Sequence, residues 1–110
     1  MATMDNKKRN EIILNLTCEL LSKINFEVDN AFVEDVVGEE GQVLVSVTVN
    51  KPGGLIGFRG RNMAALQLIL SLMVKKELGE WVRVLLDINN YRGEQKERLE
   101  NMAKELANKA

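Results

Sequence analysis

The chain has 110 residues, of which 45% are hydrophobic and 28% are charged, and its net charge is only −1. This profile is typical of one soluble globular domain. The near-zero net charge excludes a polybasic protein that binds nucleic acid through its overall electric field. Any nucleic-acid-binding site must therefore be a local basic patch. The absence of histidine removes the commonest general base and the commonest zinc ligand, and a single cysteine excludes an internal disulfide and a thiolate metal site.

The first predicted element is an amphipathic helix from about Lys8 to Ile24, with apolar residues at helical spacing on one side and charged residues on the other. Cys18 lies in its apolar stretch and is predicted to be a small buried hydrophobic residue. Residues 1–7 are predicted to be a disordered tail. No apolar run suits a signal peptide or reaches the roughly 20 residues of a spanning helix, so we predict a cytoplasmic protein without membrane insertion.

A β-hairpin is predicted next. Its first strand lies within Phe26–Val37, a four-residue turn covers Gly38–Gly41, and its second strand, Val43–Val49, alternates apolar and polar residues almost strictly. The first strand has an imperfect period, which indicates a bulge or a twisted edge.

The strongest break in the chain is Pro52–Gly60, which holds the only proline and four of the eight glycines. After it, Arg61–Leu78 is predicted to be a helix that Gly79 caps. Its apolar residues cover most of the circumference, which suits burial between a sheet and another helix. A third strand is predicted over Trp81–Ile88, and a highly charged helix over about 91–110 is appended to it.

The order helix, strand, strand, Gly-rich loop, helix, strand, helix predicts an α+β fold with a mixed three-stranded sheet. The two hairpin strands are antiparallel, whereas the second and third strands, which a helix joins, should be parallel with a right-handed crossover. We expect the amphipathic helices to pack together on one side of this sheet.

The segment Gly57–Gly60 reads Gly-Phe-Arg-Gly and is the candidate binding loop. It is not a P-loop, since no Lys-Ser or Lys-Thr pair occurs, and Leu55 stands where a dinucleotide motif requires glycine. The two glycines let the backbone approach a sugar-phosphate chain, the amides at the next helix start favour phosphate oxygens, and Arg59 and Arg61 add positive charge. This chemistry predicts binding without catalysis, and no cofactor, metal or small-molecule substrate.

Four linked segments around this loop resemble the KH domain of bacterial Jag proteins, also called SpoIIIJ-associated proteins. They are Leu55–Gly60, Ala65–Gln67, Val84–Asp87 and Tyr91–Arg92, and the similarity runs from about the first helix to the C-terminus. The resemblance implies a single KH domain of the type II topology with an appended C-terminal helix. In that family the Gly-x-x-Gly stretch contacts RNA, a role that carries over to Gly57–Gly60.

The chain departs from the family pattern in two ways. Phe58 occupies a position of the variable pair that is usually more basic, which predicts weaker phosphate attraction or a stacking surface. The family usually continues into a second single-stranded-nucleic-acid domain with an Arg-x-x-x-His motif, and this sequence stops before it. We expect the chain to be a fragment of a longer protein; the alternative is a naturally short relative.

The sequence thus predicts a non-enzymatic domain that clamps the backbone of a short single-stranded RNA segment. The alternative is a protein-interaction scaffold that uses the KH fold to dimerise with itself or with another KH protein. Trp81 and Tyr91 are predicted to serve packing rather than base stacking. The predicted RNA-binding residues are Lys51, Ile56, Gly57, Phe58, Arg59, Gly60, Arg61 and Asn62.

Overall fold

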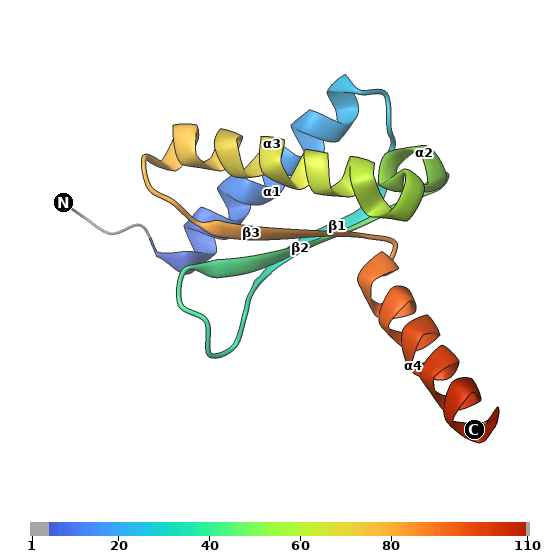
Figure 1. The fold of residues 1–110 in the computed structure, drawn as a ribbon. Coiled ribbons are helices and arrows are strands. Elements are labelled where there is room, and N and C mark those ends of the chain that lie inside the picture. Colours follow the sequence, from blue (N-terminus) through green and yellow to red (C-terminus); the bar gives the residue numbers. More distant parts are fainter. Residues whose placement is uncertain (1–4, 110) are drawn as a thin grey trace.

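The computed structural model describes residues 5–109, except for the side chain of Phe58. Its elements are α1 (Asn6–Lys23), β1 (Val28–Asp35), β2 (Gln42–Val49), α2 (Gly53–Ile56), the 3-10 turn η1 (Phe58–Gly60), α3 (Arg61–Leu78), β3 (Arg83–Ile88) and α4 (Tyr91–Lys109) (Figure 1). The α+β class and the predicted order are confirmed, and the arrangement is that of a type II KH-like fold. The short helix α2 inside the glycine-rich segment was not predicted.

The three strands form one mixed sheet in the order β1-β2-β3. β1 and β2 are antiparallel, while β2 and β3 are parallel, as the sequence predicted. At the centre of the sheet Val45 pairs with Val33 on one side and with Leu86 on the other. Because successive strand residues point to opposite faces, every second residue of β2 and β3 is buried beneath the helices.

The first strand contains the predicted bulge. Val28 pairs with Val49 but Asn30 already pairs with Thr48, so Asp29 is an extra residue in β1. The bulge moves the inward face of the strand by one position, which is why the apolar period of the sequence is broken there. The strand is also shorter than predicted, and residues 36–41 join it to β2 in place of a four-residue turn.

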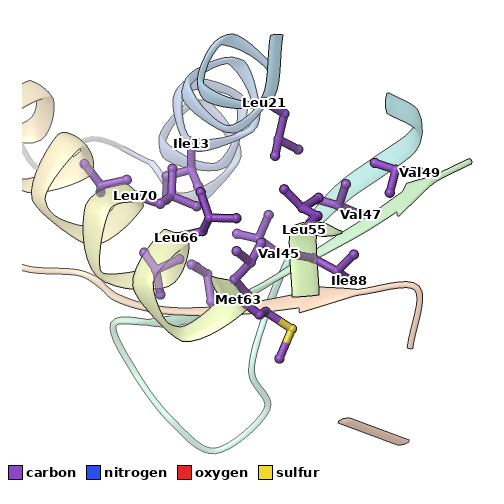
Figure 2. Packing of buried hydrophobic residues seen from close by; sticks show 14 of the residues in the cluster. Ile13, Leu21, Val45, Val47, Val49, Leu55, Met63, Leu66, Leu70 and Ile88 are labelled. Atoms are coloured by element: carbon purple, nitrogen blue, oxygen red, sulfur yellow. The ribbon is translucent and has the colours of Figure 1, made fainter. Parts of the chain in front are cut away.

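Helices α1 and α3 cover one face of the sheet, and their apolar side chains meet those of the strands in one core (Figures 1 and 2). Ile13 and Leu70, one from each helix, are fully buried. Leu55 of α2 also lies in this core and is 2% exposed. Burial of a leucine side chain stabilises by roughly 2 kcal/mol. The glycine-rich segment is therefore attached to the core directly before Gly57.

α1 begins at Asn6, two residues earlier than expected, because the side chain of Asp5 accepts a hydrogen bond of 2.8 Å from the amide of Lys8. Part of the predicted tail is thus helical, and residues 1–4 lie outside the described residues. The prediction of a buried Cys18 is wrong, since this residue is exposed. Thr17 takes the buried position instead, and its hydroxyl donates to the carbonyl of Ile13 at 2.8 Å.

The expected burial of α3 between the sheet and another helix holds only in part. α3 packs on the sheet and beside α1 but leaves a third side open, where Leu68, Ile69 and Leu72 are 62%, 45% and 52% exposed. α4 has no buried residue and projects away from the rest of the domain (Figure 1). None of the helices in the described part of the chain is both long and apolar enough to cross a membrane.

Candidate nucleic-acid interface

The loop between α2 and α3 reverses the chain within four residues. α2 closes with hydrogen bonds of 2.9 Å from the amides of Ile56 and Gly57 to the carbonyls of Pro52 and Gly53. Gly57 then adopts φ 75° and ψ −178°, a conformation that is essentially restricted to glycine. Positive φ values follow at Arg59 (55°) and Gly60 (77°) before α3 begins. This succession brings the ends of two helices together around a tight turn.

Both glycines of the loop also lie against neighbouring side chains. A Cβ atom on Gly57 would lie 2.6 Å from Cγ of Asn62, and one on Gly60 would lie 3.0 Å from Cε1 of Tyr91. The Asn62 side chain is held in place because its Nδ2 donates to the carbonyl of Gly54 at 2.8 Å. Asn62, predicted to bind RNA, therefore links the first turn of α3 to α2 within the protein.

The predicted cations surround the loop unequally. Arg59 lies within it and Arg61 opens α3, and both side chains are exposed. Lys51 is exposed as well, between β2 and α2. Ile56 is half-buried against the core and anchors the loop. The structure thus places both arginines at the turn itself and the lysine before it.

The N-terminus of α3 has the features of an anion site. Its cap residue, Gly60, provides no side-chain hydrogen bond, and its first turn contains no acidic residue. The first amides of a helix have no intrahelical acceptor, and they carry the positive end of the helix dipole. Phosphate oxygens are suitable acceptors for these amides.

A shallow apolar groove of about 240 Å³ lies beside the loop. Its lining comes from the end of α1, the segment before β1, α2 and α3: Ile24, Phe26, Gly54, Leu55, Asn62, Ala65, Leu66 and Ile69. The sequence did not indicate that Ile24, Phe26, Ala65 and Ile69 belong to the site. Because Ile24 and Phe26 are some thirty residues away from the loop in the chain, no local sequence pattern indicates that they line the groove.

A wider hollow of about 890 Å³ opens near the start of α1 and the β1–β2 connection. Its acidic lining residues are Asp5, Asp35, Glu39, Glu40 and Glu80. Carboxylates repel phosphates, so the larger hollow is unsuited to a nucleic-acid backbone. Within residues 5–109, no group of three or more histidine, cysteine or acidic side chains has an arrangement that could hold a metal ion.

The first turn of α4 packs against the loop and links it to the core. Tyr91 packs against Gly60 and the core, which confirms its predicted packing role. Arg92 donates from Nε to the carbonyl of Leu86 at 3.0 Å and from a terminal nitrogen to Oε1 of Gln67 at 2.8 Å. These contacts join α4, β3 and α3 next to the loop.

Trp81 lies at the opposite end of α3, an 18-residue helix that separates it from the loop by roughly 27 Å. Its side chain is 67% exposed, with Nζ of Lys75 at 5.5 Å from the ring centroid. The prediction that Trp81 packs inside the domain is therefore wrong, and the residue is not part of the loop site.

No family model matches the chain. The chain is 37% identical over 106 residues to RNA-binding protein KhpB of Clostridium symbiosum, a match that covers 93% of this chain and 47% of that protein. It thus spans about half the length of this curated relative. The alignment confirms the resemblance that the loop and its flanking segments indicated in the sequence.

Proposed function

We propose that this chain, which belongs to the Jag family of KH-domain proteins, is a non-enzymatic, cytoplasmic domain. In this proposal the Gly57–Gly60 loop clamps the backbone of a short single-stranded RNA segment. The observation that carries the proposal is the loop itself. It is a glycine-bounded turn at an uncapped helix N-terminus, with one exposed arginine, Arg59, within it and another, Arg61, directly after it. The relative's name as an RNA-binding protein supports the same function.

In the proposed complex, the amides at the start of α3 donate to phosphate oxygens. Gly57 and Gly60 allow the loop its positive φ values and its close packing on Asn62 and Tyr91, which keep the turn compact where the backbone of the RNA would lie. Arg59 and Arg61 supply the positive charge that the chain as a whole, with a net charge of −1, does not provide. Affinity then depends on a few local contacts and falls as salt concentration rises.

The groove beside the loop is the proposed place for a base. An unstacked base has an apolar face, and single-stranded RNA is bound in KH domains by a backbone contact at the loop with bases beside it. The groove offers aliphatic side chains and one aromatic residue, Phe26, within the reach of a nucleotide whose phosphate lies on the loop. Ile69 continues this surface along α3.

The experiment compares two double variants with the same change in net charge. Phe58→Asp/Arg59→Asp alters the loop, while Val37→Asp/Lys76→Asp alters two exposed positions in the β1–β2 connection and at the far end of α3. We expect the loop variant to lose at least about tenfold in affinity for a short fluorescent single-stranded RNA, measured by fluorescence anisotropy, with the control close to the unmodified protein.

Circular dichroism and melting temperature should be nearly unchanged in both variants, since Val37, Arg59 and Lys76 are exposed. Unaltered affinity in the loop variant would refute the proposal. An equal loss in both variants would also refute it, because net charge alone would then account for binding.

A further inference from the structure

Helix α4 is attached to the domain only through its beginning. Its described contacts come from Tyr91, which packs against the core, and from Arg92, which bonds to β3 and α3. The remainder of the 19-residue helix, like its beginning, contains no buried residue. In proteins, most of the stability of a helix comes from the packing of its amphipathic face and not from the propensity of its residues. This isolation indicates that α4 packs against a further molecule or segment.

One side of α4 is apolar. Leu99, Met102 and Leu106 are 56%, 52% and 69% exposed and recur at positions i, i+3 and i+7. This spacing places them on one face, and it is the a and d pattern of a two-helix seam, with Leu99 and Leu106 at a and Met102 at d. A stripe of large apolar side chains on a projecting helix is typical of an interaction surface.

The charged residues beside the stripe can pair with those of a second copy of the same helix. In the same heptad frame Arg98 and Glu105 both occupy g positions. When two such helices run antiparallel with Leu99 opposite Met102 of a second copy, each g position faces a g position, so Arg98 meets Glu105 of the second copy. Two identical antiparallel helices are related by a two-fold axis, so the same ion pair occurs twice, as an isologous interface requires. In a parallel pair, Arg98 would face Ala103, which carries no charge.

The charges needed for this pairing are not engaged elsewhere in the described structure. The ion pairs within residues 5–109 include Arg9–Asp35 and Lys23–Glu19. Neither Arg98 nor Glu105 takes part in them. Both stand exposed on a helix whose own stripe has no partner in the domain.

We propose that α4 joins two copies of this chain as an antiparallel helix pair, with Leu99, Met102 and Leu106 in its seam and two Arg98–Glu105 ion pairs along one edge of it. The arrangement would separate the two copies of Tyr91, and with them the two Gly57–Gly60 loops they support, by roughly 28 Å along the helix axis. Self-association through α4 does not require RNA and is independent of the proposed function.

The test uses charge reversals on the whole chain, followed by sedimentation equilibrium. Arg98→Glu and Glu105→Arg each place like charges at both Arg98–Glu105 positions, and we expect each variant to self-associate at least about tenfold more weakly than the unmodified chain. Mixing the two variants brings opposite charges together again, and a one-to-one dimer should form. Glu97→Arg, on the outer side of α4, is the control and should associate as the unmodified chain does.

Circular dichroism checks that α4 stays helical in every variant. An unmodified chain that remains monomeric at the highest attainable concentration would overturn the proposal. So would a dimer that is indifferent to both reversals, or two variants that fail to associate when mixed, since the interface would then lie elsewhere or a different partner would occupy the stripe.

Discussion

At the scale of single residues, the two glycines of the loop are required for different contacts. Gly57 combines a backbone conformation that other residues avoid with close contact to Asn62, whose amide is in turn bonded to Gly54. Gly60 packs against the ring of Tyr91, the first residue of α4. The shape of the loop thus depends on side chains that come both from its immediate neighbour and from more distant sequence.

The substitution Gly57→Ala should destabilise the protein by about 2 kcal/mol or more, because it adds backbone strain and displaces the Asn62 side chain from its hydrogen bond. Gly53→Ala is the matched control. No atom lies within 4 Å of its added Cβ, and the residue begins a helix, so stability should be unchanged or about 0.4–1 kcal/mol higher. Urea unfolding gives both values, and equal stability in the two variants would contradict this account of the loop.

The residue types in the loop were predictable, whereas their contacts were not. The spacing of Gly57 and Gly60, with arginines beside them, identified the candidate site from sequence alone. The hydrogen bond of Asn62 and the contact of Tyr91 with Gly60 depend on how segments fold against each other, which no short motif encodes.

At the scale of the elements, helices and strands were predictable because their periods of 3.6 and 2 residues are local properties of the sequence. Which side of a helix is buried depends on its neighbours. Cys18 is exposed and Thr17 buried because the sheet meets α1 along the line that also includes Ile13. α3 keeps an open apolar side for the same reason: α1 covers only one of its flanks.

The groove between these helices gives a prediction for α3. Ala65→Glu puts a carboxylate into the groove and should reduce RNA affinity about tenfold, through repulsion of phosphates and loss of apolar surface. Ala64→Glu adds the same charge one residue earlier, outside the groove lining, and should reduce affinity less. Both residues are exposed, so unfolding free energies should stay within about 0.5 kcal/mol.

Fluorescence anisotropy with one short RNA compares the two variants directly. If Ala64→Glu weakened binding as much as Ala65→Glu or more, the bases would not occupy the groove. The RNA would then contact the opposite flank of α3.

At the scale of the whole molecule, the charge distribution gives the near-neutral chain two unlike ends. Carboxylates gather around the hollow at the start of α1, while the glycine loop, with its arginines and uncapped helix, lies at the other end of the sheet. We therefore expect the loop end to attract a phosphate chain more strongly than the end with the acidic hollow does. α4 begins at the attractive end, so its proposed pairing would hold two such loops in one assembly.

The most direct test of the central claim is a titration of the isotope-labelled chain with short single-stranded RNA, followed through its backbone amide resonances by NMR. The account predicts that the largest shifts occur at the amides of residues 57–62 and that smaller shifts follow along the groove, because the first amides of α3 are the proposed phosphate donors. Shifts confined to the open face of the sheet or to the region of Trp81, with the loop amides unmoved, would contradict it.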